Sequence, residues 1–115
     1  MAAELLIRTN VIKRNGQEVK FDIQKIVNAI QKANHEVAPV HQMNEYQIRG
    51  AAEKVAGQIG SSKHAVNVED IQDMVETAIM EMRGYEVAQK YVRYRYKREL
   101  ARKSNTTDDE ILSLI

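Results

Sequence analysis

The chain has 115 residues, of which 43% are hydrophobic and 29% are charged, as in an ordinary soluble domain and unlike a disordered or collagen-like chain. It contains no cysteine, which excludes disulfide scaffolds, cysteine zinc sites, iron–sulfur clusters and thiol catalysis within these residues. The formal net charge is +1, but residues 90–103 hold seven Lys/Arg against one Glu, so a basic segment is set against an acidic remainder.

The first predicted element is a β-hairpin, with an extended run over residues 5–12 and a return strand over 17–21. The Asn-Gly dipeptide at 15–16 lies between them and is typical of a two-residue turn in which both residues take positive φ. Such a turn pairs Lys13 with Glu18, although a bulge would shift the register. The residues that then share one face are Val11, Lys13, Glu18 and Lys20.

Two helices are predicted next. Asp22 is the expected N-cap of a helix that runs to about Ala33, and a loop containing His35, Pro39 and His41 follows. Asn44 opens the second helix, with Gln47 at the capping-box position, and Gly60 ends it. Apolar residues recur at helical spacing in both, and the residues expected to face the core are Ile26, Ala29, Ile30, Ala33, Ile48, Ala51, Ala52, Val55 and Ile59.

The second half of the chain predicts one more strand and two more helices. Residues 65–68 are predicted to form a short strand that can join the hairpin. A helix with acidic residues in its first turn then follows and is expected to end at Gly84. A last helix is predicted to begin at Tyr85, and its inward-facing positions recur on one face for about four turns. The inward-facing residues are expected to be Ile71, Met74, Val75, Ala78, Met82, Val87, Ala88, Tyr91, Tyr94, Arg98 and Ala101. The fold class predicted is α+β, with a small hairpin or three-stranded sheet capping a four-helix bundle.

Signals for catalysis are weak. The three histidines, His35, His41 and His64, stand in loop-like stretches without metal-ligand spacing, and no nucleophile-elbow or metalloprotease motif occurs. We therefore expect that this chain alone is not an enzyme, with no catalytic residue and no protein side chain that binds a metal.

Positive charges gather around the hairpin. Lys13 and Arg14 precede the turn, and Lys25 lies in the first turn of the following helix, where unpaired N–H groups and the helix dipole also attract anions. These groups can hold a phosphate. The alternative is that Lys13 pairs with Glu18 while Arg14 and Lys25 are solvated.

The last helix interleaves tyrosines with Lys and Arg, a pattern that also suggests a nucleic-acid-binding module. Helical geometry places Tyr91 and Tyr94 on the apolar face and leaves Arg93 and Lys97 outward. Nucleic-acid binding is therefore kept as an alternative, and nucleic acid is not the expected partner.

Two clusters of residues resemble the ATP-cone family. Val11-Ile12-Lys13-Arg14-Asn15-Gly16 is similar to the hairpin of these domains, and Phe21-Asp22-Ile23-Gln24-Lys25-Ile26 with Ala29-Ile30 is similar to the helix start. Residues 69–82 and 88–98 look like the later segments, so the resemblance covers about residues 9–103. Residues 101–114 look most like the exit from the cone of anaerobic, glycyl-radical ribonucleoside-triphosphate reductases.

The resemblance implies an allosteric regulatory domain that binds ATP as activator or dATP as inhibitor of a ribonucleotide reductase, and acts through oligomeric state or domain arrangement. The ATP-cone of a transcriptional repressor is an alternative, but the cysteine zinc ribbon that precedes it there has no counterpart here. Residues 1–103 would form the cone. Residues 104–115, with a capping box at 107–110, would be a linker or the start of the next element toward a catalytic domain.

The implied partners are ATP or dATP, the rest of a reductase polypeptide and a second copy of the chain in a homo-oligomer. No stretch approaches the roughly 20 apolar residues that span a bilayer, and the first residues lack the pattern of a signal peptide. The expected location is the cytoplasm, without a membrane partner.

The resemblance also implies a nucleotide site. Val11, Ile26 and Ile71 would offer apolar surface to the adenine, and Asp22 would lie at the base or ribose edge. The side chains that would meet the triphosphate are Lys13, Arg14, Lys25 and Arg98, with Mg²⁺ bridging the phosphate oxygens.

Four further candidates surround these residues: Glu18, Val19, Phe21 and Gln72. Many cones carry a glutamate at the position of Val19, whereas this chain has Glu18 one residue earlier, which in a strand lies on the opposite face. Either a bulge brings Glu18 round, or backbone groups read the adenine. Gln72 stands where some relatives carry histidine, so the contacts at the sugar end differ as well.

Overall fold

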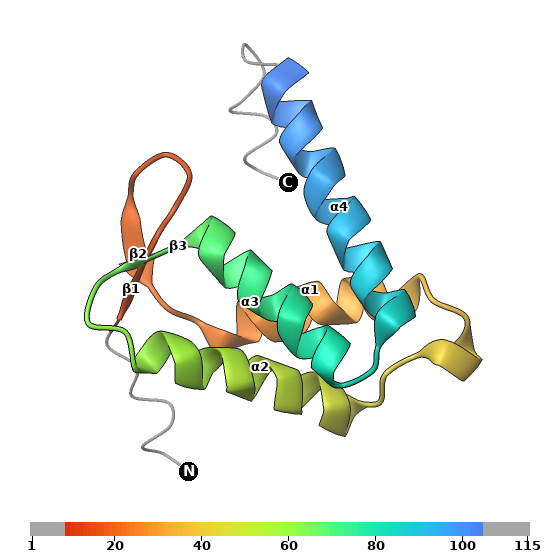
Figure 1. The fold of residues 1–115 in the computed structure, drawn as a ribbon. Coiled ribbons are helices and arrows are strands. Elements are labelled where there is room, and N and C mark those ends of the chain that lie inside the picture. Colours follow the sequence, from red (N-terminus) through yellow and green to blue (C-terminus); the bar gives the residue numbers. More distant parts are fainter. Residues whose placement is uncertain (1–8, 105–115) are drawn as a thin grey trace.

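The computed structural model describes residues 9–104, which form a small sheet and four α-helices (Figure 1). The strands are β1 (Asn10–Ile12), β2 (Glu18–Lys20) and β3 (Val66–Asn67). The helices are α1 (Ile23–His35), α2 (Glu45–Gly60), α3 (Val68–Glu81) and α4 (Tyr85–Ser104), with a 3₁₀ turn at Pro39–His41. The predicted α+β fold is confirmed. The expected start of the hairpin at 5–8 and the capping box at 107–110 lie outside the described residues.

The sheet has the order β2-β1-β3, with β1 antiparallel to β2 and parallel to β3. The third strand predicted within residues 65–68 is therefore present as Val66–Asn67. Because β3 pairs with β1 and runs directly into α3 at Val68, the start of α3 is brought beside the hairpin.

The hairpin turn differs from the two-residue turn that we predicted. The backbone N–H of Gly16 donates to the carbonyl of Lys13 at 2.9 Å, and the N–H of Lys13 donates to the carbonyl of Gln17 at 2.8 Å. Gly16 has φ +86°, whereas Asn15 does not have positive φ and instead accepts from the N–H of Gln17 through its side chain at 2.9 Å. This is a longer turn that ends in a glycine bulge.

The bulge moves the register by one residue. Val11 lies opposite Val19, and Ile12 lies opposite Glu18, so the predicted Lys13–Glu18 pair is wrong. Val11 is buried and Val19 packs against the same core, which places both on the inner face. The predicted face that joined Val11 to Glu18 is wrong for the same reason, because a shift of one residue reverses the face of a strand.

The predicted starts of the first two helices are confirmed in atomic detail. Asp22 accepts a hydrogen bond from the N–H of Gln24 at 3.0 Å, as expected of an N-cap. Asn44 and Gln47 form the reciprocal capping box, with bonds of 2.8 and 2.9 Å. The first helix continues two residues beyond the predicted end, so His35 belongs to its last turn and not to a loop.

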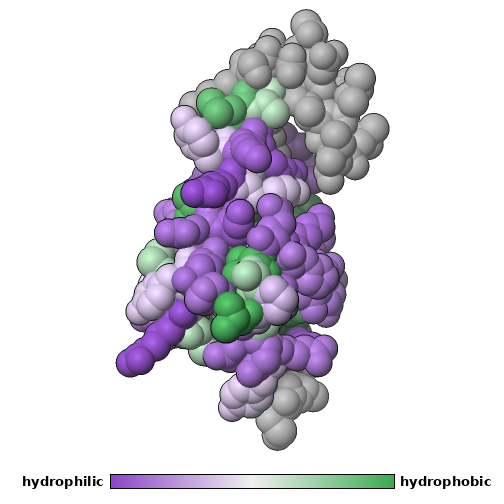
Figure 2. All heavy atoms as spheres, turned by 90° about the vertical axis from the view of Figure 1, so that its right-hand side faces the viewer, coloured by the Kyte–Doolittle hydropathy of each residue, from purple (hydrophilic) through white to green (hydrophobic). Residues whose placement is uncertain are grey.

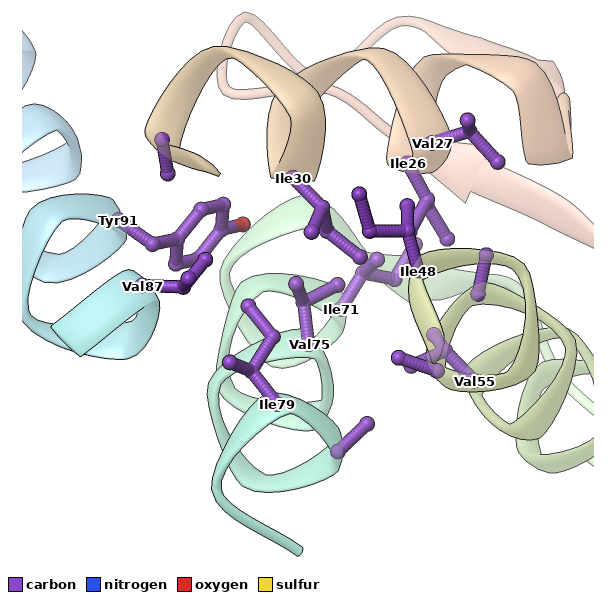
Figure 3. Packing of buried hydrophobic residues seen from close by; sticks show 14 of the residues in the cluster. Ile26, Val27, Ile30, Ile48, Val55, Ile71, Val75, Ile79, Val87 and Tyr91 are labelled. Atoms are coloured by element: carbon purple, nitrogen blue, oxygen red, sulfur yellow. The ribbon is translucent and has the colours of Figure 1, made fainter. Parts of the chain in front are cut away.

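The core lies between the helices, and Figure 3 shows apolar side chains from α1, α2, α3 and α4 pointing into it. The largest side chains that are fully buried are Ile30, Ile59, Ile79, Val55, Val75 and Val87. The inward faces predicted for α1, α2 and α3 are confirmed, with Ala29, Met74 and Met82 packed at the margin of the cluster.

The residue that ends α3 differs from the predicted one. Arg83, and not Gly84, takes the left-handed conformation, with φ +64°. A Cβ on Gly84 would lie 2.8 Å from Sδ of Met43 and 3.2 Å from Cγ2 of Ile79. A side chain at position 84 would therefore require Met43 to shift.

The last helix leaves the bundle partway along its length, as Figure 1 shows. Val87, Ala88 and Tyr91 are buried, but Arg98 is exposed, so the predicted inward face is fully buried for about two turns only. The molecular face in Figure 2 is mostly hydrophilic, with small separate hydrophobic areas. Among residues 9–104, no helix combines the length and apolar character needed to cross a bilayer.

Candidate functional site

The tip of the hairpin is fastened to the first turns of α3. Arg14 donates from Nη2 to Oε1 of Gln72 at 3.1 Å, and its Nη1 lies 3.5 Å from Oε2 of Glu69. The side chain of Arg14 is 24% exposed as a result. The alternative that Arg14 is simply solvated is therefore wrong, and Gln72 lies beside the basic hairpin.

A second arginine joins α4 to the same part of α3. Arg95 donates from Nη1 to Oδ1 of Asp73 at 2.7 Å and also binds Glu76, while its Nη2 donates to the backbone carbonyl of Glu69 at 3.4 Å. Burial by itself lowers the pKa of Arg95, but the hydrogen bonds with Asp73 and Glu76 outweigh it and raise the pKa above its ordinary value. Arg95 is therefore charged at neutral pH.

These contacts connect three elements, and we call them the tip network. Its members are Arg14, Glu69, Gln72, Asp73, Glu76 and Arg95. Glu69 contacts both arginines of the network, because its carboxylate faces Arg14 while its backbone carbonyl accepts from Arg95. The tip network thus links the hairpin tip to α4 through the first turns of α3.

Tyr91 stands where the apolar core meets the tip network. It is 6% exposed, and in Figure 3 its hydroxyl points from α4 into the bundle. Burial raises the pKa of Tyr91 to about 12, with the charge of Arg95 opposing the shift and that of Glu76 adding to it. Since Tyr91 is buried, its ring is not available for stacking on nucleic-acid bases.

The apolar residues predicted to contact adenine come together. Val11 from β1, Ile26 from α1 and Ile71 from α3 are all buried members of one cluster, and Figure 3 shows Ile26 and Ile71 directed into the same core. Val19 and Phe21 pack against that cluster and are partly buried. These residues line the junction between the sheet and the helices, which is where the resemblance places the base.

The remaining predicted cations lie on the surface. Lys13 and Lys25 are exposed, and among residues 9–101 they form no ion pair. The guanidinium of Arg98 lies 5.7 Å from the centre of the Tyr94 ring, one turn beyond Arg95 on α4. Among the side chains of the four predicted phosphate ligands, that of Arg14 contacts another predicted site residue, Gln72, while the backbone N–H of Lys25 donates to the carbonyl of Asp22 at 3.1 Å.

The predicted acidic candidates also have defined positions. Asp22 is exposed, and its carboxylate is used to cap α1. Glu18 is exposed on the outer face of the hairpin, where it accepts from Nδ2 of Asn10 at 3.3 Å. The bulge therefore does not bring Glu18 to the inner face. Within the part of the chain that the structure describes, no three His, Asp or Glu side chains gather to hold a metal ion.

Sequence reasoning missed Arg95 and its partners Asp73 and Glu76. A signal was present, because Glu69, Asp73 and Glu76 follow the spacing i, i+4 and i+7 and therefore share one face of α3. An acidic stripe on one helix, followed by a basic helix, indicates a pairing between the two helices.

Comparisons with known proteins give a consistent result. Residues 9–100 match the family described as ATP cone domain. The chain is 36% identical over 107 residues to an anaerobic ribonucleoside-triphosphate reductase of Haemophilus influenzae, with 91% of this chain and 15% of that protein aligned. It is also 32% and 31% identical to the ribonucleoside-diphosphate reductase subunits alpha of Chlamydia pneumoniae and Chlamydia muridarum.

Those two alignments cover 87% and 90% of this chain but 10% of each relative, so the chain spans only a small part of the length of the proteins it matches. The family match, by contrast, runs through β1 and most of α4. The fold agrees with it, since a basic hairpin is followed by four helices, in the order that the two signature clusters predict. The chain therefore belongs to the ATP-cone domain family.

Proposed function

We propose that this chain is an allosteric regulatory domain that binds ATP or dATP and controls the overall activity of a ribonucleotide reductase. The observation that carries the proposal is the family match over residues 9–100, together with a basic hairpin held against α3 by Arg14. The reductases among its relatives support the choice of partner. In this proposal residues 1–103 are the cone, and residues 104–115 lead toward a catalytic domain.

The triphosphate is assigned to the basic residues of the hairpin, α1 and α4. Lys13 and Lys25 are exposed and carry no ion pair within the described residues, so their ammonium groups are available to phosphate oxygens. Arg14 and Arg98 complete a set of four cations, which balances the about four negative charges of a nucleoside triphosphate. Mg²⁺ would bridge the phosphate oxygens, in keeping with its preference for substrate phosphates and water.

The base is assigned to the junction between the sheet and the helices. Val11, Ile26 and Ile71 would meet the adenine ring at their exposed edges. Because Val19 and not Glu18 lies on the inner face, we assign recognition of the adenine amino group to the backbone of β2. Asp22 and Phe21, between β2 and α1, would border the base and the ribose.

Regulation requires that one hydroxyl, the only difference between ATP and dATP, changes a helix position or an oligomer interface. A coupling of about 1–3 kcal/mol between two sites is typical of such control. The tip network offers a physical connection, since it joins the hairpin through α3 to α4, the helix that leads into residues 104–115.

Thermal unfolding with nucleotide tests the proposal directly. A ligand that binds only the folded state stabilises it by about 2.7 kcal/mol at one hundred times its Kd. We expect ATP and dATP with Mg²⁺ to raise the Tm of the 115-residue chain. A folded chain whose Tm is unchanged at millimolar nucleotide would contradict the proposal, and calorimetric titration beside light scattering would measure affinity and mass.

The phosphate assignment has its own test. Lys13→Ala combined with Lys25→Ala should weaken ATP binding by at least about tenfold, because each lysine removed costs an ionic contact to the triphosphate. The matched control is Lys32→Ala combined with Arg49→Ala, which removes the same charge from exposed positions on α1 and α2. Equal affinity of the two double variants would show that the phosphates bind elsewhere.

A further inference from the structure

One residue outside the set of proposed nucleotide ligands has an unusually complete set of partners. Arg95 is 20% exposed and binds two carboxylates and a backbone carbonyl, all on the first turns of α3. An arginine guanidinium presents its donors in a rigid fork, so three acceptors fix its position and orientation. This is far more than the single contact of an ordinary surface ion pair.

The position of its partners on α3 matters. Glu69, whose carbonyl accepts from Arg95, is the residue whose carboxylate faces Arg14. Gln72, which accepts from Arg14, stands directly before Asp73, which accepts from Arg95. The two arginines thus bind neighbouring positions on one face of α3, Arg14 from the hairpin and Arg95 from α4.

We propose that Arg95 is a positioning residue for the nucleotide site, which fixes the first turns of α3 so that Glu69 and Gln72 orient Arg14 toward the phosphates. The inference rests on the proposed function, because it names how that site is held. Arg95 does not bind the nucleotide itself: its guanidinium is occupied by Asp73 and Glu76.

A positioning role and a direct phosphate-binding role for Arg95 predict opposite effects on nucleotide affinity when the carboxylates of Asp73 and Glu76 are removed. If Arg95 acts through α3, removal of the carboxylates releases the same turns and weakens nucleotide binding. If Arg95 were a direct phosphate ligand, removal of the carboxylates would free its charge and leave binding intact or strengthen it. The variants Asp73→Asn and Glu76→Gln therefore separate positioning from direct contact.

The experiment is calorimetric titration of the 115-residue chain with ATP and Mg²⁺. We expect Arg95→Gln to weaken binding about three- to tenfold, the doubly substituted Asp73→Asn/Glu76→Gln chain to weaken it to a similar extent, and the triple variant to lose little more. Arg95→Lys should recover part of the loss, because a lysine keeps the charge without the fork. In an Arg14→Gln background, the effect of Arg95→Gln should fall within twofold.

The control is Arg93→Gln, which removes the same charge from an exposed position two residues earlier on α4 and should leave affinity within twofold. Unchanged or tighter binding in the Asp73→Asn/Glu76→Gln chain, or an undiminished effect of Arg95→Gln without Arg14, would overturn the inference. Should Arg95→Gln fail to fold, Asp73→Asn alone provides the test, since Asp73 is 67% exposed. If the unsubstituted chain binds no nucleotide, the proposed function fails first.

Discussion

The helical bundle and the hairpin of this domain are held in place by different forces. The bundle buries a continuous cluster of apolar side chains, among them Ile79, which has no exposed surface. The hairpin has three-residue strands, one buried side chain in Val11, and a tip attached to α3 through the guanidinium of Arg14. Burial of an aliphatic side chain contributes about 1.5–3 kcal/mol, whereas an exposed ion pair contributes about 0–1 kcal/mol.

The difference shows where a ligand can act. Binding energy of a few kcal/mol is too small to rearrange the bundle, but it is large compared with the contacts at the hairpin tip. A ligand that binds at the hairpin would therefore move the hairpin tip before it moved the core. The following predictions test this contrast, beginning with the largest effect.

Ile79→Ala should destabilise the domain most, because it leaves a cavity in a site with no exposed surface. We expect a loss of about 2–5 kcal/mol in the free energy of unfolding, measured by urea denaturation. Met80→Ala at the neighbouring exposed position is the control and should cost far less. A loss below about 1 kcal/mol for Ile79→Ala would mean that the bundle is as loosely held as the hairpin.

Tyr91 tests the boundary between the two regions through pH. Its phenol should ionise near pH 10 in the unfolded chain but only near pH 12 in the folded domain. The unfolded state therefore loses its proton first, so the stability present below pH 10 is lost as the pH rises toward 12. Relative to Tyr91→Phe, the unsubstituted chain should lose about 2–3 kcal/mol over this interval. Parallel pH profiles of the two proteins would show that Tyr91 is solvated.

Gly16→Ala should destabilise the hairpin alone, by about 1 kcal/mol, since an alanine is strained at positive φ. A Cβ at this position meets nothing within 4 Å, so no steric clash contributes. The control is Gly57→Ala in α2, where a Cβ also meets nothing and helix propensity predicts a gain of up to about 1 kcal/mol. If both variants changed the free energy of unfolding in the same direction, as measured by urea denaturation, the result would contradict the bulged turn.

Arg14→Gln should have the smallest effect on stability. Its ion pair with Glu69 is partly exposed, so we expect a change below about 1 kcal/mol in the free energy of unfolding. The same variant should weaken ATP binding measured by titration calorimetry. A stability loss as large as that of Ile79→Ala would show that the hairpin tip is a structural anchor and not a mobile contact.

Local signals in the sequence predicted much of this fold correctly. The caps at Asp22 and Asn44 depend on residues at most three positions away, and both formed as expected. The spacing of apolar residues such as Ile30 and Val55 identified the buried helix faces, because that spacing is a property of the helix itself. The placement of the nucleotide among the candidate residues stays a prediction.

The incorrect predictions concern features that depend on contacts between segments far apart in the sequence. Asn15-Gly16 suits both a two-residue turn and a turn with a glycine bulge, and the choice depends on burying Val11 and Val19 on one face. The contacts of Arg95 were missed because they join residues 22 and 19 positions apart, and they depend on how α3 and α4 pack.

By itself, the sequence of this protein determined the helices, the caps at the starts of α1 and α2, the inward faces of α1, α2 and α3, and the motifs of an ATP-cone, because each rests on interactions among residues close together in the chain. Only the tertiary structure decided the register of the hairpin and the partners of its charges. Arg14 meets Gln72 58 positions away because β3 pairs with β1 and carries α3 to the hairpin. Such pairings require the whole domain to fold, since no local interaction distinguishes one exposed arginine from another.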